Sequence, residues 1–168
     1  SVVGEITATR MTVLDVTSLT APKVVSTWTV PGTYVSARRV GSMVRLVLRG
    51  DISYPAGVKT YVSGAWDLSG WQLEARFNQV KKDNTAIINN TPLESWLPRG
   101  DVKLASGDTV PLNYTCSGFY RPNAPVALGM TSVVSLDLDL PKSPPKSVTV
   151  LGQASTIYSS RDALYLAS

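Results

Sequence analysis

Hydrophobic residues alternate with polar ones from residue 4 to residue 50, and this period of two is typical of β-strands. Turn-forming residues divide the stretch at Pro22, at Pro31-Gly32 and at Gly41-Ser42. The pattern predicts four short strands, at 12–16, 23–30, 34–38 and 43–48. Four strands with tight turns within about 40 residues would form one small antiparallel sheet, so we expect a blade-like β unit over 1–50.

The period changes in the middle of the chain, where we expect an insertion over 51–129 that carries helices. Hydrophobic residues spaced by three or four, with Asn84 among them, make one side of a helix at about 70–90: Leu73, Phe77, Val80 and Ile87. A second, short helix is expected at about 92–97, because Thr91 and Glu94 have the spacing of a capping box, with Pro92 in the first turn.

The β pattern returns over 130–168, which we expect to be a second blade-like unit within one structural domain. Val13–Val16 corresponds to Ser135–Leu138 with a separation of 122 residues. Further matches follow in the same order: a proline-containing turn, a strand, a glycine (Gly32 and Gly152), a segment ending in arginine (Arg38 and Arg161) and a final apolar strand. An internal repeat of four-stranded units predicts a mainly β fold of about two antiparallel propeller-type blades, with the helical insertion between strands.

These stretches resemble a known family, the secreted bacterial and archaeal proteins with a C-terminal β-propeller domain distantly related to WD40 repeats. The resemblance rests on Thr12–Val16, Pro31–Arg38, Trp96–Arg99, Ser132–Leu138 and Ile157–Tyr165, with Cys116 in its aromatic surroundings. It implies a secreted or cell-envelope location and brings no catalytic residues. It also implies that the chain is a segment of a larger propeller, or a subunit that completes its sheets with neighbouring chains, since unpaired strand edges invite association.

Composition narrows the chemistry. The chain has no histidine, which excludes Ser-His-Asp and Cys-His catalysis and histidine-ligated metals. The net charge is +4, but the basic residues are scattered rather than clustered on one face, so nucleic-acid binding is not expected. No apolar run is long enough to span a membrane. The single cysteine, Cys116, has aromatic neighbours and is expected to be a small buried residue.

Three groups of residues are candidates for a site. Trp71 and Trp96, with Phe77, would pack the insertion against a blade or form an aromatic ligand cage. Arg38 and Arg161 would bridge blades by pairing with aspartates, or bind an anion in a central channel. Asp137 and Asp139 would shape the turn after their strand, or hold Ca²⁺, or act as paired acids.

We therefore expect a non-catalytic, extracytoplasmic scaffold or binding module without a cofactor, unless Ca²⁺ binds at the aspartates. Its partners would be other proteins, further copies of itself or the remaining blades of the same propeller. Two alternatives stay open. The chain could be the propeller segment of a secreted hydrolase, or a self-assembling structural subunit.

Overall fold

A computed structural model describes residues 7–112, 114–141, 143–160 and 162–167. It divides the chain into two compact units rather than the single domain expected. The helical unit is Ser53–Trp96, and the sheet unit contains residues 7–52 and 97–167. We describe each unit by itself. Within the described residues, no helix is long and apolar enough to cross a membrane.

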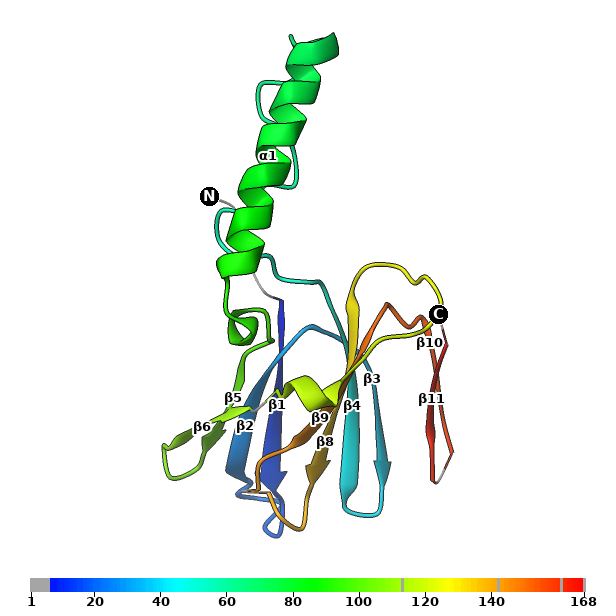
Figure 1. Cartoon of the computed structure of the whole chain (residues 1–168). Coiled ribbons are helices and arrows are strands. Elements are labelled where there is room, and N and C mark those ends of the chain that lie inside the picture. Colours follow the sequence, from blue (N-terminus) through cyan, green and yellow to red (C-terminus); the bar gives the residue numbers. More distant parts are fainter. Residues whose placement is uncertain (1–6, 113, 142, 161, 168) are drawn as a thin grey trace. The chain divides into compact units, whose positions relative to one another are not determined.

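The sheet unit contains three sheets (Figure 1). The first sheet is antiparallel and has the order β1-β2-β5-β6. Its strands are β1 (Ala8–Asp15), β2 (Lys23–Pro31), β5 (Gly100–Leu104) and β6 (Thr109–Leu112).

The second sheet has the order β3-β4-β8-β9-β7, and the third is the hairpin β10-β11. In the second sheet only the short β7 runs parallel to its neighbour. The strands are β3 (Thr33–Val40), β4 (Met43–Gly50), β7 (Phe119–Tyr120), β8 (Met130–Asp137), β9 (Lys146–Leu151), β10 (Thr156–Ser159) and β11 (Leu164–Ala167). A 3-10 turn, η2 (Cys116–Gly118), precedes β7.

The predicted blades exist, but their membership differs from the expectation. The four strands expected within 1–50 all form, yet β1 and β2 belong to the first sheet whereas β3 and β4 belong to the second. A single blade-like unit over 1–50 is therefore wrong. Likewise β5 and β6, which lie inside the predicted insertion, extend the first sheet. The physical reason lies at Gly32, whose positive φ of 111° turns the chain from one sheet to the next instead of back along β2.

The first and second sheets pack against each other around one hydrophobic core. The first sheet contributes Trp28, Val30 and Val102, and the second contributes Leu46, Leu48, Val134 and Leu136. Alternate residues of β2 are buried, as expected for a strand with one face in the core. Trp28 is fully buried, and its indole Nε1 donates a 2.9 Å hydrogen bond to the equally buried Ser26 Oγ.

Hydrogen bonds confirm the internal repeat. Thr9 Oγ1 donates to the Gly32 carbonyl at 2.7 Å, and Thr131 Oγ1 donates to the Gly152 carbonyl at 2.9 Å. Both glycines have positive φ, at 111° and 129°. Each repeat thus anchors the crossing to the next sheet by the same threonine–glycine contact.

The two helices of the helical unit lie close to the predicted positions: α1 is Gly70–Asn90 and the 3-10 turn η1 is Leu93–Ser95. The capping box at Thr91 does not form. Instead, Thr91 ends α1, with its amide bonded to the Ile88 carbonyl and its hydroxyl donating to the Ile87 carbonyl at 2.7 Å. This hydroxyl is therefore engaged by the preceding helix and does not cap the following turn.

Candidate functional site

In the helical unit, residues 57–62, which form no helix or strand, run antiparallel along α1. Asn84 fixes it with two hydrogen bonds to the backbone of Lys59: the Lys59 amide donates to Asn84 Oδ1 at 2.9 Å, and Asn84 Nδ2 donates to the Lys59 carbonyl at 2.8 Å. Nearby, Gly57 lies against Ile87, because a Cβ at this glycine would be 3.3 Å from Ile87 Cδ1. The side of α1 predicted from its spacing is thus the side that meets this segment.

A groove of about 370 Å³ lies between the segment and the helix. Its apolar side chains are Phe77, Val80 and Ile88 from α1, with Tyr61 and Val62 opposite. Lys59 and Lys81 also line it. Such a groove, apolar with a few charged residues, suits an apolar side chain of a partner better than a charged ligand.

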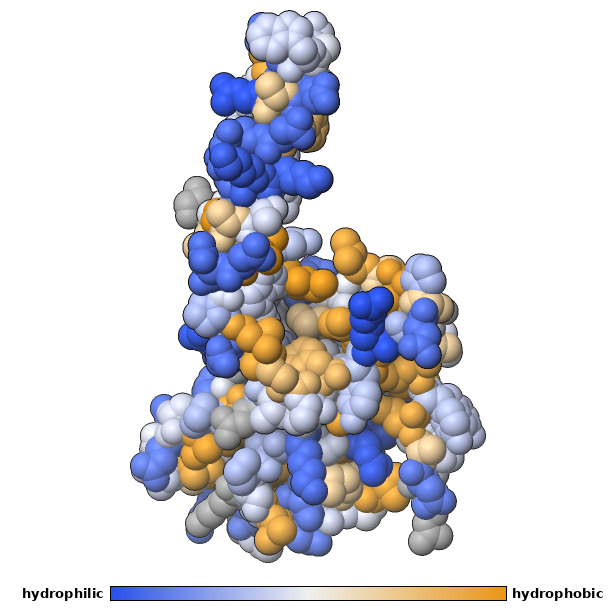
Figure 2. Space-filling model, in the orientation of Figure 1, coloured by the Kyte–Doolittle hydropathy of each residue, from blue (hydrophilic) through white to orange (hydrophobic). Residues whose placement is uncertain are grey.

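Aromatic side chains of the same unit are exposed outside the groove. Trp66 is 97% exposed and Trp71 is 77% exposed, and no residue of α1 is buried. Figure 2 shows hydrophobic residues interspersed among hydrophilic ones along this unit. Large exposed aromatic residues are uncommon on surfaces that stay in water, and tryptophan and tyrosine are enriched at protein interfaces.

The helical unit has no net charge. Ser53–Trp96 contains four basic and four acidic residues, so the excess positive charge of the chain lies elsewhere.

The two predicted tryptophans, Trp71 and Trp96, differ in exposure. Trp71 and Phe77 are exposed, at 77% and 55%. Trp96 is partly buried at the end of η1, where its amide donates to the Leu93 carbonyl at 3.0 Å. Trp66, which sequence reasoning missed, is the most exposed of the three tryptophans. The available signal was its place beside Asp67 in a segment without periodicity, where a core position is not expected.

The structure describes one arginine of the predicted pair. Arg38 is exposed on β3, and its Nη1 donates to Ser36 Oγ at 2.9 Å and to the Ala37 carbonyl at 2.8 Å. Arg161 lies outside the described residues. The hairpins nevertheless show that the two positions do not correspond. Arg38 pairs with Arg45 inside its hairpin, whereas β10 ends at Ser159, and Tyr158, paired with Tyr165, is at the equivalent register.

Asp137 is the last residue of β8, and Asp139 lies in the turn that follows. Strand β8 ends at Asp137, and Asp137 Oδ1 accepts a 3.1 Å hydrogen bond from the Asp139 amide. The repeat makes the same turn after β1, where Asp15 Oδ1 accepts from the Thr17 amide at 2.9 Å and from its hydroxyl at 2.7 Å. The backbone amide of Thr17 is the main cause that lowers the pKa of Asp15. Among the residues that the structure describes, no cluster of three or more Asp, Glu, Cys or His side chains could hold a metal ion.

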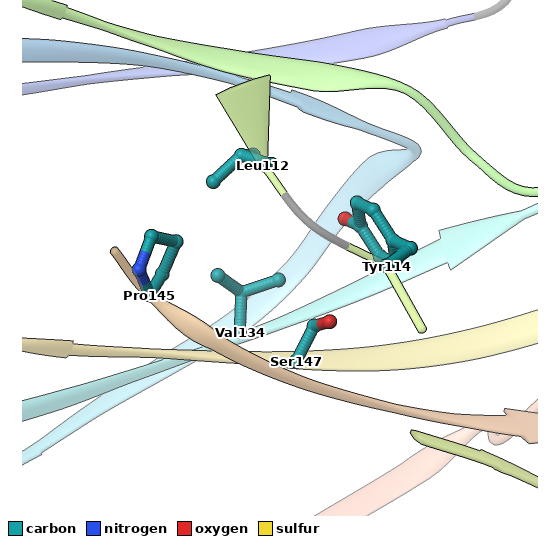
Figure 3. A pocket seen from close by; sticks show the side chains of 5 residues that line it. All are labelled: Leu112, Tyr114, Val134, Pro145 and Ser147. Carbon is teal, nitrogen blue, oxygen red and sulfur yellow. The ribbon is translucent and has the colours of Figure 1, made fainter. Parts of the chain in front are cut away.

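Cys116 is exposed in η2, so its predicted burial is wrong. The buried residue of this region is Tyr114, which is 7% exposed. Its ring lies beside a narrow hollow with Leu112, opposite Val134, Pro145 and Ser147 (Figure 3). The hollow has no room for a water molecule, and the Tyr114 hydroxyl has no hydrogen-bond partner.

Tyr114→Phe is expected to stabilise the protein by about 1–2 kcal/mol, because it removes a buried hydroxyl without a partner. Burial also raises the pKa of Tyr114 to about 12 from 10.0. The folded state therefore holds this proton longer than the unfolded state, and stability falls as the pH rises from about 10 to 12. Urea unfolding at pH 8 and pH 11 checks both effects. The variant should lose less stability at pH 11 than the original protein, and an equal loss would contradict the assignment to Tyr114.

Comparison with known proteins gives one match. A family model described as "Beta propeller domain" matches residues 1–168. No curated protein matches, and no solved structure matches.

Proposed function

The chain belongs to the beta propeller domain family, and from this premise we propose that it is a non-catalytic binding module outside the cytoplasm. In this proposal the sheets are a rigid support, and the helical unit is the surface that binds a partner protein. The location follows from the resemblance to secreted propeller proteins.

The observation that carries the proposal is the exposure of aromatic residues beside an apolar groove in one small unit. Trp66 and Trp71 are the most exposed large hydrophobic residues of the helical unit, and Tyr61 is exposed at the groove. Aromatic residues at the centre of an interface supply most of its binding energy. The balanced charge of the unit favours a protein partner with apolar side chains over an anionic ligand.

The test is a binding comparison with the extracellular and envelope fraction of the source organism. The immobilised protein is expected to retain a partner, which is identified by mass spectrometry and then titrated as a purified protein by calorimetry. Trp66→Ala with Trp71→Ala should weaken the measured affinity at least about tenfold, because each buried interface tryptophan contributes more than about 1 kcal/mol.

Tyr120→Ala is the matched control, since Tyr120 is an exposed aromatic residue of β7 in the sheet unit. It should leave the affinity unchanged. Circular dichroism establishes that each variant is folded. Equal affinity of the double variant and the original protein would contradict the proposal that the helical unit binds the partner. A loss of affinity in the Tyr120→Ala control alone would indicate that the binding site lies on the sheets.

A further inference from the structure

The charges of the helical unit are unevenly placed around the groove between residues 57–62 and α1 (Figure 1). Two basic side chains, Lys59 and Lys81, line this groove, and none of the described residues that line it is acidic. The acidic residues of the unit lie elsewhere: Asp67, Glu74, Asp83 and Glu94. The groove is therefore positive, although the unit as a whole has no net charge.

The neighbours of Lys81 on its own helix do not neutralise it. Side chains three or four positions apart are neighbours on a helix, whereas those two apart do not face each other. The positions three and four away from Lys81 hold residues without a charge: Phe77, Asn78, Asn84 and Thr85. Asp83 is two positions away, and its Oδ1 accepts a 2.7 Å hydrogen bond from Gln79 Nε2. No intrahelical carboxylate therefore has the spacing to pair with Lys81.

The apolar part of the groove is exposed to water. Phe77 is 55% exposed and Ile88 is 42% exposed, and Tyr61 across the groove is 73% exposed. Covering these side chains would remove apolar surface from water, which favours binding. The volume of about 370 Å³ is near the lower end of the range for ligand sites, about 300–1,000 Å³, so the groove suits a short segment.

Hydrogen bonds define the shape of the groove without a ligand. The side chain of Asn84 bonds to both the amide and the carbonyl of Lys59, at 2.9 Å and 2.8 Å. These two bonds hold residues 57–62 at a fixed distance from α1 at the level of the two lysines. A preformed groove loses less conformational entropy on binding than one that must first be ordered.

We propose that the groove binds an acidic segment of the partner protein, in which a large apolar side chain is flanked by aspartate or glutamate. This inference rests on the proposed function and names the part of the partner that the helical unit recognises. The apolar side chain lies against Phe77 and Ile88, and the carboxylates pair with the ammonium groups of Lys59 and Lys81. The concave shape and small volume favour a side chain of a peptide over the broad surface of an anionic membrane.

Fluorescence anisotropy of labelled peptides with the full chain measures this preference. Three peptides of equal length share a central leucine and phenylalanine, flanked by aspartate and glutamate, by serine and glycine, or by lysine and arginine. The acidic peptide is expected to bind about threefold to thirtyfold more tightly than the neutral one, because two partly exposed ion pairs each contribute modestly. Added salt should reduce this difference. Equal affinity of the acidic and neutral peptides overturns the inference.

Charge reversal at one position of α1 tests whether the groove itself is responsible. Lys81→Glu should weaken binding of the acidic peptide at least about tenfold, because repulsion replaces attraction. Lys82→Glu is the matched control: it makes the same change of charge at an exposed residue of α1 that does not line the groove and is turned about 100° around the helix. Circular dichroism establishes that both variants are folded. Equal losses in the two variants would show that net charge alone attracts the peptide, and would overturn the inference.

Failure of this inference is distinguishable from failure of the proposed function. If binding of the purified partner depends on Trp66 and Trp71 but Lys81→Glu leaves it unchanged, the helical unit binds its partner without an acidic segment and the inference is wrong. Vesicles of equal amounts of phosphatidylcholine and phosphatidylserine test the membrane alternative. Cosedimentation that Lys81→Glu abolishes, without binding of the acidic peptide, would assign the groove to an anionic membrane and would also overturn the inference.

Discussion

Trp28→Ala is expected to destabilise the sheet unit by about 3–5 kcal/mol, the usual cost of truncating a buried tryptophan. The side chain is fully buried in the core between the first and second sheets, so the vacated volume cannot fill with water at little cost. Its loss also leaves the buried Ser26 hydroxyl without the indole donor 2.9 Å away. Urea unfolding followed by circular dichroism measures the change.

The repeat supplies the control for this prediction. Val148 is at the same place in β9, but it is 43% exposed, so Val148→Ala should cost under about 1 kcal/mol. Trp28→Phe separates the two causes, because it keeps most of the packing and removes only the donor to Ser26. Similar losses for Trp28→Ala and Val148→Ala would mean that the core does not lie where the structure places it.

Much of the secondary structure was predictable because it follows from local patterns. The spacing of Leu73, Val80 and Ile87 predicts α1 almost to its ends, and alternation predicts the strands within 1–50 and 130–168. The family match over residues 1–168 confirms the propeller class. These features depend on residues that are close together in the sequence. The hydrophobic periodicity and the turn-forming residues therefore indicate them directly.

The assignment of strands to sheets was not predictable from the same patterns. Alternation shows that a strand has one buried face, but not which strand lies beside it. Strand β5 pairs with β2 across a long separation in the sequence, and β6 pairs with β5; only the tertiary structure shows this. The predicted capping box at Thr91 was wrong for a related reason. The Thr91 hydroxyl could bond either to the following turn or to the preceding helix, and in the structure it donates to the Ile87 carbonyl of α1.

Some residues of the candidate site were named from the sequence and others were not. Trp71 was named from sequence and is exposed in the helical unit, but Trp66 was missed because its segment has no regular period. Arg38 and Arg161 were matched by residue type, whereas the hairpin register places Tyr158 at the position of Arg38. Cys116 was expected to be buried but is exposed, whereas the nearby Tyr114 is buried, because hydrophobic neighbours do not tell which of two nearby residues points into the core.

The crossing between sheets gives the second large prediction. Gly32→Ala is expected to cost about 3–5 kcal/mol, from backbone strain and a steric clash together. The φ of Gly32 is +111°, which residues with a Cβ rarely adopt, and the added Cβ would lie 2.9 Å from the Arg49 carbonyl oxygen. Because that oxygen belongs to the backbone of β4, relief requires a shift of the strand itself. Urea unfolding gives the change in the free energy of unfolding.

Substitutions at two other glycines separate the contribution of backbone strain from that of the steric clash. Gly41→Ala places a Cβ in open space at a φ of +61°, so it should cost only the conformational strain of about 1–2 kcal/mol. Gly152→Ala, the repeat equivalent, has a φ of +129° and places its Cβ 3.3 Å from the Val126 side chain, which can move; we expect about 1–3 kcal/mol. The expected loss in the free energy of unfolding is therefore largest for Gly32→Ala, smaller for Gly152→Ala and smallest for Gly41→Ala. If Gly32→Ala were as mild as Gly41→Ala, β4 would not lie against the crossing between the first and second sheets as the structure places it.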